Sequence, residues 1–174
     1  AKIYGGFSLG ERKAERDIKA MMTNPLSSDH AAILLPASYD EEGNFRIIEG
    51  DANALSSDTV FDGFTVAGGD MSNQADDFDN LRGSGMYNNN SSPLVANCTF
   101  ANNKAGKGGA VYNLNSSPTF SNCSFTNNQT KGVFPEDGGA LFNSMSSPDI
   151  TDCDFSGNMA VNGGALYNES SAPK

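Results

Sequence analysis

Four aspartates within ten residues are the best candidates in this chain for binding a metal ion: Asp70, Asp76, Asp77 and Asp79. Their carboxylate oxygens are hard ligands of the kind that Ca²⁺ prefers. The segment that holds them, Asp70 to Asn80, is predicted to be an acidic loop, and its spacing matches neither an EF-hand nor a calcium-binding nonapeptide repeat. The sequence therefore allows two interpretations here, a Ca²⁺ site or a solvated acidic loop.

The three cysteines follow a repeat period and not the spacing of metal ligands. Cys98, Cys123 and Cys153 occupy the same position in successive repeats. In-register parallel strands hold Cβ atoms roughly 4.8 Å apart, slightly beyond the usual separation of about 3.5–4.5 Å in a disulfide. We expect buried thiols that fill apolar space, with a Cys98–Cys123 or Cys123–Cys153 disulfide as the alternative. A metal site or catalytic thiol is disfavoured because the sole histidine, His30, is distant in the sequence.

Residues suited to polysaccharide cleavage are sparse. Such sites need paired carboxylates, or basic groups that neutralise an acidic sugar and abstract a proton. One repeat carries Asp149, Asp152 and Asp154 without a basic residue nearby in the array. Four cations fall on a predicted helix, Gly10 to Met22, whose charged face is more simply explained as solvated; they are Arg12, Lys13, Arg16 and Lys19. We predict no catalytic and no cofactor-binding residue.

A short sequence repeat organises the back half of the chain. Its motifs are Phe-x-x-Asn, Gly-Gly-Ala-(Val/Leu) and Ser-Ser-Pro. The step from Pro93 to Pro118 equals the step from Pro148 to Pro173, whereas the step from Pro118 to Pro148 is five residues longer. The five extra residues fall within Gln129 to Asp137, and an insertion confined to one corner is typical of a solenoid.

The repeat period alone also fits a leucine-rich repeat. That fold needs leucine at the apolar positions, where this chain has Val95, Phe120 and Ile150, and it needs a helical segment, of which no 3.6-residue periodicity gives a sign. The sequence therefore predicts an all-β fold, a right-handed single-stranded parallel β-helix with about 25 residues per coil.

The apolar spacing predicts how each coil bends. Cys123 and Phe125 are two residues apart and share a strand face, whereas Phe120 and Cys123 are three apart, which breaks the alternation. Asn122 sits between them, and asparagine tolerates left-handed dihedral angles. We expect corners at three sets of equivalent positions: Asn97, Asn122 and Asp152; Asn103, Asn128 and Asn158; and the Gly-Gly pairs.

An aromatic series lies beside an aliphatic one: Tyr87, Tyr112, Phe142 and Tyr167 next to Met86, Val111, Leu141 and Leu166. Adjacent strand residues face opposite ways, so only one series is core. An outward aromatic series would suit a carbohydrate or protein partner. The sequence leaves the two orientations open, with the aliphatic residues favoured as core.

Residues 1–82 are expected to form irregular early coils with lateral excursions, continuous as one domain with the regular repeats at 83–174. Short strands are predicted at four sites, with Asp62-Gly63 as a bend and Ala67-Gly68-Gly69 as an echo of the Gly-Gly corner; these strands are Ala32–Leu35, Phe45–Ile48, Thr59–Phe61 and Phe64–Val66.

Charge and hydropathy restrict the partners. The formal net charge of −10 disfavours nucleic acid and anionic membrane surfaces. No apolar run approaches the roughly 20 residues of a membrane-spanning helix, so direct membrane insertion is not expected. The chain starts and stops in mid-pattern, and we expect it to be part of a longer protein, pairing with further coils of that protein or associating end to end.

The paired motifs resemble the repeat of chlamydial polymorphic outer-membrane proteins. Phe-x-x-Asn stands at 100–103, 125–128 and 155–158, and Gly-Gly-Ala-(Val/Leu) at 108–111, 138–141 and 163–166, about half of the chain. The first repeat departs, with Gly83-Ser84-Gly85-Met86 in place of the glycine motif. The resemblance implies a segment that is exported and displayed at the bacterial surface, where many such passengers act in adhesion.

Two functions follow as hypotheses. The first is a non-catalytic segment of a secreted or cell-surface β-helix protein, an adhesin passenger, stalk or scaffold for a glycan or protein partner. The second is a carbohydrate-active module, a polysaccharide lyase or glycoside hydrolase, because enzymes of those classes also use parallel β-helices. Fold alone does not choose between them.

Overall fold

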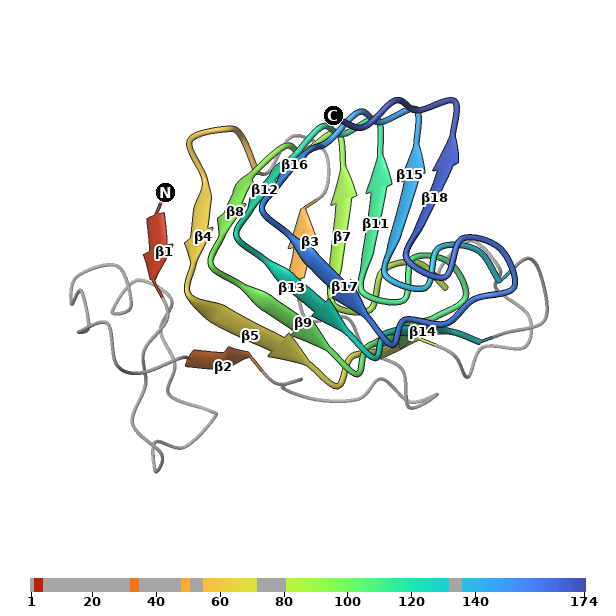
Figure 1. Cartoon of the computed structure of the whole chain (residues 1–174). Helices are drawn as coiled ribbons and strands as arrows, with labels where there is room; N and C mark the ends of the chain where they lie inside the picture. Colours follow the sequence, from red (N-terminus) through yellow and green to blue (C-terminus); the bar gives the residue numbers. More distant parts are fainter. Residues whose placement is uncertain (1, 5–31, 35–47, 51–54, 72–80, 132–135) are drawn as a thin grey trace.

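The computed structural model describes residues 2–4, 32–34, 48–50, 55–71, 81–131 and 136–174. Within these ranges the chain winds through successive coils of short strands, and every strand pair is parallel (Figure 1). The described residues contain no helix, so none of the membrane-spanning kind is present among them. The predicted helix at Gly10 to Met22 lies outside the described residues.

The coils contribute strands to four sheets, here called A to D in chain order around the coil; only the three middle coils have a described strand in sheet C. Sheet A holds β1 (Lys2–Tyr4), β4 (Val60–Asp62), β8 (Leu94–Ala96), β12 (Thr119–Ser121) and β16 (Asp149–Thr151). Sheet B holds β2 (Ala32–Leu34), β5 (Phe64–Ala67), β9 (Thr99–Ala101), β13 (Ser124–Thr126) and β17 (Asp154–Ser156). Sheet C holds β6 (Asp70–Met71), β10 (Lys104–Ala105) and β14 (Gln129–Thr130). Sheet D holds β3 (Ile48–Gly50), β7 (Met86–Asn89), β11 (Val111–Leu114), β15 (Leu141–Ser144) and β18 (Leu166–Glu169).

The register confirms the stacking of equivalent residues. Phe120 pairs with Val95 on one side and with Ile150 on the other, and Phe125 pairs with Phe100 and Phe155. The front half joins the same sheets, because β1 pairs with β4, β2 with β5 and β3 with β7.

Strand pairing also defines more closely where the insertion lies. Gln129 pairs with Lys104 and so keeps the shorter repeat step, whereas Asp137 pairs with Lys107 across the longer one. The five extra residues therefore lie between Thr130 and Asp137, on the path from sheet C to sheet D.

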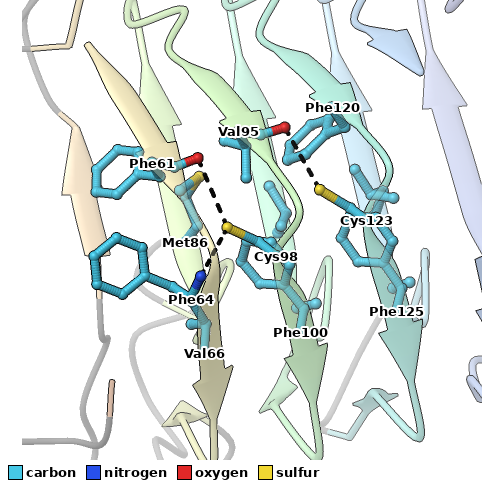
Figure 2. Close-up of a cluster of buried hydrophobic side chains, with 14 residues drawn as sticks. Phe61, Phe64, Val66, Met86, Val95, Cys98, Phe100, Phe120, Cys123 and Phe125 are labelled. Carbon is cyan, nitrogen blue, oxygen red and sulfur yellow. Dashed lines mark hydrogen bonds between the residues drawn. The ribbon is translucent and has the colours of Figure 1, made fainter. Parts of the chain in front are cut away.

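The core lies inside the coils, where the apolar positions predicted from the repeat converge. Phe100, Phe120 and Phe125 are fully buried, and Cys98 and Cys123 pack with them (Figure 2). Rings stack from coil to coil: the Phe125 centroid lies 5.1 Å from that of Phe100 and 4.8 Å from that of Phe155. These separations match the spacing of neighbouring strands, about 4.8 Å.

Corners form where single residues adopt positive φ. The predicted A-to-B corner is confirmed at Asn97 (φ 53°), Asn122 (52°) and Asp152 (53°), and the Gly-Gly corner between sheets C and D at Gly108 (60°) and Gly138 (70°). Left-handed φ is cheap for glycine and tolerable for asparagine, which is why those residues recur at corners.

The second predicted corner is confirmed between sheets B and C, where Asn103 and Asn128 lie between the strands. Its left-handed residues are Asn102 and Asn127, one position earlier than the buried Asn103 and Asn128, and the expectation for Gly68-Gly69 was wrong. The pair Gly68-Gly69 belongs to this same corner and not to the Gly-Gly corner, because the Gly69 N–H donates to Asn103 Oδ1 at 3.0 Å. The Phe-x-x-Asn asparagine is thus an interior residue that follows the corner.

The spacing also gave no notice of a fourth corner, between sheets D and A. Its left-handed residues are Asn90 (φ 51°), Asn115 (48°), Met145 (48°) and Ser170 (51°). Asparagine holds this position in two coils, but methionine and serine replace it in the next two, so the repeat did not mark it.

Candidate functional site

The aspartates proposed for Ca²⁺ are only partly within the described residues. Asp70 lies in strand β6, so the predicted loop does not begin at this residue, and its carboxylate is 3.7 Å from Lys104 Nζ in the next coil. Asp76, Asp77 and Asp79 lie outside the described residues. Within the described part of the chain, no group of three or more His, Cys, Asp or Glu side chains is arranged to hold a metal ion.

The other candidate groups for catalysis are scattered. Arg12, Lys13, Arg16, Lys19 and His30 lie outside the described residues. The three aspartates of the last repeat lie on different parts of one coil and are all exposed: Asp149 in sheet A, Asp152 at the corner and Asp154 in sheet B.

The cysteines form a column of free thiols, as expected, and not a disulfide; Cys98 and Cys123 are buried as predicted, whereas Cys153, in the last coil, is only partly buried. Two of the sulfurs accept a backbone N–H from the preceding coil: Phe64 N–H donates to Cys98 Sγ at 3.4 Å, and Cys123 N–H donates to Cys153 Sγ at 3.4 Å. The Cys98 and Cys123 thiols also face carbonyl oxygens of the preceding coil, Phe61 at 3.7 Å and Val95 at 3.5 Å (Figure 2). A thiol therefore suits this position better than a methyl group, because it pairs buried backbone groups next to the corner.

The Cys98 and Cys123 thiols shift each other's pKa in opposite directions. The hydrogen bond from Cys123 lowers the pKa of the Cys98 thiol, and the same bond, followed by burial, raises the pKa of Cys123. Burial also raises the pKa of Cys153. A reactive thiolate needs an electropositive and partly exposed setting. The two inner thiols are only 2% exposed and bonded to backbone, so they are structural groups.

The aromatic series takes the outer face of sheet D, and the aliphatic series is core, as favoured. Met86, Val111 and Leu141 are fully buried in the core cluster, and the rings point to the other face. Neighbouring rings stack, with the Tyr112 and Phe142 centroids 4.9 Å apart and nearly parallel at 4°.

This outer aromatic column is less open than a binding platform requires. Tyr112 is 3% exposed and Phe142 is fully buried, and only Tyr87 and Tyr167 are partly exposed. The Gly-Gly corners cover it: an added Cβ at Gly108 would lie 3.1 Å from Phe142 Cβ. Burial raises the pKa of Tyr112.

Two cationic side chains also cover the outer aromatic column, a feature that the sequence interpretation missed. The Arg82 guanidinium carbon lies 5.2 Å from the Tyr112 ring centroid, and Lys107 Nζ lies 4.8 Å from that of Phe142. Each cation caps the ring of the following coil, a cation–π contact that needs their side chains on the outer face. The only signal in the sequence is their equal spacing before successive Gly corners.

Hydrogen bonding between stacked asparagines was anticipated, but the position of two polar columns inside the coils was missed. In sheet D, each asparagine amide donates to the next: Asn88 Nδ2 to Asn113 Oδ1 at 2.9 Å, and Asn113 Nδ2 to Asn143 Oδ1 at 2.8 Å. A serine column follows the D-to-A corner, where Ser91 N–H donates to Ser116 Oγ and Ser116 N–H to Ser146 Oγ, both at 3.0 Å. The recurrence of these residues was visible, but nothing showed that they point inward.

One known protein family matches most of the chain. Residues 47–173, which are 127 of the 174, match the family described as a right-handed β-helix region. The protein belongs to this family. The comparisons with curated proteins and with solved structures gave no match.

Proposed function

We propose that this chain is a non-catalytic scaffold segment of a secreted or cell-surface β-helix protein, serving as an adhesin passenger or stalk. The observation that carries the proposal is that the recurring groups capable of chemistry are used between coils. Thiols pair with backbone, asparagine amides pair with one another, and the two buried rings of the outer aromatic column, Tyr112 and Phe142, lie under glycine corners and cations.

Display at the bacterial surface rests on the resemblance to chlamydial polymorphic outer-membrane protein repeats. A rod of stacked coils suits display, because it presents a regular outer surface and gains length with each added coil. The test is protease or antibody access to this segment on intact bacterial cells of the source strain. Access only after lysis would overturn the proposed location.

The partner of such a scaffold would be a glycan or a protein that contacts an outer face. The test is a binding screen of the chain against glycans and host surface proteins, with depolymerisation of the same polysaccharides assayed on the same sample. Binding without cleavage supports the scaffold. Release of oligosaccharides would replace it with the carbohydrate-active alternative.

A face scan would then locate the partner. Three half-buried residues point outward from different sheets, so an arginine at each perturbs one face and leaves the core unchanged: Thr119 in sheet A, Ser124 in sheet B and Leu114 in sheet D. Loss of binding in one of Thr119→Arg, Ser124→Arg and Leu114→Arg identifies the contact face, and the other two are its controls. Equal binding by all three would exclude these faces.

The scaffold proposal also includes association through coil edges. The last coil presents the outer edges of β17 and β18, whereas the edge of β16 pairs with the backbone of Lys174. The apolar residues of this coil are only partly buried: Ile150, Phe155 and Leu166. Such edges pair with further parallel strands. Light scattering of the isolated chain over a concentration series should show self-association, whereas a monomer at all concentrations would contradict it.

A further inference from the structure

The asparagine column of sheet D begins at Asn88, although one more strand of that sheet, β3, precedes it. Its amides point the same way, each Nδ2 donating to the Oδ1 of the following coil, from Asn88 through Asn113 and Asn143 to Asn168. The first acceptor, Asn88 Oδ1, therefore has no asparagine before it. Within the described part of the chain no group donates a hydrogen bond to this oxygen, although the Asn88 side chain is 0% exposed and its oxygen is buried.

The preceding coil explains this gap in the pairing. Strand β3 is in register with β7, and the residue opposite Asn88 is Gly50. Ile48, two residues earlier, pairs with the buried Met86 and packs against the core, and the register of the same strand places Gly50 at the level of the inward-facing Asn88. Because glycine has no side chain, the column stops where a fifth amide would have donated to Asn88 Oδ1.

The acceptor at this end is a strong one. Hydrogen bonds in a chain polarise one another, and the aligned amide dipoles concentrate negative charge on Asn88 Oδ1. A buried acceptor without a donor costs free energy that native structures nearly always avoid. A hydrogen-bond donor at this position would remove that cost.

We propose that Asn88 Oδ1 binds one buried water molecule, which takes the place of the side chain that Gly50 lacks. A water is much smaller than the carboxamide absent from the column, and buried waters typically pair with polar groups of this kind. A metal cation is a poorer occupant, because hard cations need about six or more oxygen ligands and the column offers one.

Two measurements test the site. In a high-resolution crystal structure of the unaltered chain, we expect a water peak within about 3.2 Å of Asn88 Oδ1. Density that shows no water there, or a protein donor turned onto the oxygen, would overturn the proposal. This measurement decides the matter even where a variant fails to fold.

The second measurement replaces the water with a side chain. Gly50→Asn extends the column by one amide, and Gly50→Ala is the matched control, since it restricts the unfolded chain similarly without a donor. We expect Gly50→Asn to melt about 2–4 °C above Gly50→Ala, with the water peak lost. A melting temperature of Gly50→Asn equal to or below that of Gly50→Ala would count against a donor-seeking site, and the crystallographic density decides if the two results disagree.

Discussion

Two interior columns of the same β-helix are built from opposite kinds of side chain. On sheet B, Phe100, Phe125 and Phe155 stack as rings; on sheet D, Asn88, Asn113 and Asn143 pair as amides. Both columns are buried at their centre and share one strand spacing. Because each coil repeats the one before it, identical side chains become neighbours. The stack therefore favours side chains that pair with copies of themselves, whether by dispersion or by hydrogen bonds.

The columns differ in what an interruption costs. A ring column loses the contacts of the ring removed, and its neighbours remain apolar groups in an apolar place. An amide column leaves a donor and an acceptor without partners, so its cost lies in the neighbours. Substitutions in the two columns separate these two costs.

The largest effect is expected from the ring column. Phe125→Ala removes a fully buried ring that stacks on both sides, and it should lower the free energy of unfolding by about 3–5 kcal/mol. Urea unfolding followed by circular dichroism measures this. Phe155→Ala, at a partly buried position, should cost less; an equal cost would show that ring burial does not set the energy.

The amide column should respond next, and in a way that is not additive. Asn113→Leu leaves Asn88 Nδ2 and Asn143 Oδ1 without partners and should cost about 2–4 kcal/mol. Replacing Asn88 as well removes the stranded donor and moves the column's end to Asn143. The double variant Asn88→Leu/Asn113→Leu should therefore unfold at a higher urea concentration than Asn113→Leu alone, and the reverse order would refute the amide-pairing account.

The cysteine column combines apolar packing with hydrogen bonds, and its contribution to stability depends on pH. Because the pKa of Cys123 is raised, its thiol stays protonated in the folded chain after the unfolded chain has ionised. Its stabilising contribution is complete below the unfolded pKa of about 8.5 and declines as pH rises above it, by roughly 1 kcal/mol per pH unit. Reduced samples unfolded in urea between pH 7 and pH 10 measure this. Cys98→Ala/Cys123→Ala should lose most of the decline, whereas Cys153→Ala should lose only the smaller part that comes from the raised pKa of Cys153.

The smallest effect is expected at the corner that follows the asparagine column. Met145 holds φ at 48° with its side chain 58% exposed, where the preceding coils have Asn90 and Asn115. Met145→Asn should stabilise the chain by about 0.5–1 kcal/mol, because asparagine tolerates this conformation better. Asn115→Met is the reciprocal test and should destabilise by a similar amount. A melting temperature unchanged in both would show that corner residues are interchangeable.

Much of the coil was predictable because its signals are local. The three-residue step from Phe120 to Cys123 required a turn between them, and Asn122 marked it. The repeat period fixed which residues stack, and hence the cysteine and phenylalanine columns. These inferences need only strand geometry and residue type.

What escaped prediction depends on which way a polar residue points. Asn103 was expected at a corner because asparagine suits left-handed dihedral angles, but it lies inside and donates to Val66 O at 2.9 Å. An asparagine that is buried and an asparagine that forms a corner look alike in the sequence. Only the register of the strands before and after the residue distinguishes them. The cover over Tyr112 and Phe142 escaped for a related reason, since it comes from Arg82 and Lys107 of the preceding coils.

The step along the chain from β12 to β16 is five residues longer than the step from β8 to β12, and yet both pairings are intact. A gene that gains or loses one whole repeat unit would therefore still encode a folded rod, shorter or longer by one strand spacing of about 4.8 Å. Unequal recombination between repeats would therefore change the length of the stack by one coil at a time, and each added coil would use the same core positions. An in-frame deletion of residues 94–118 would produce the shorter member of that series.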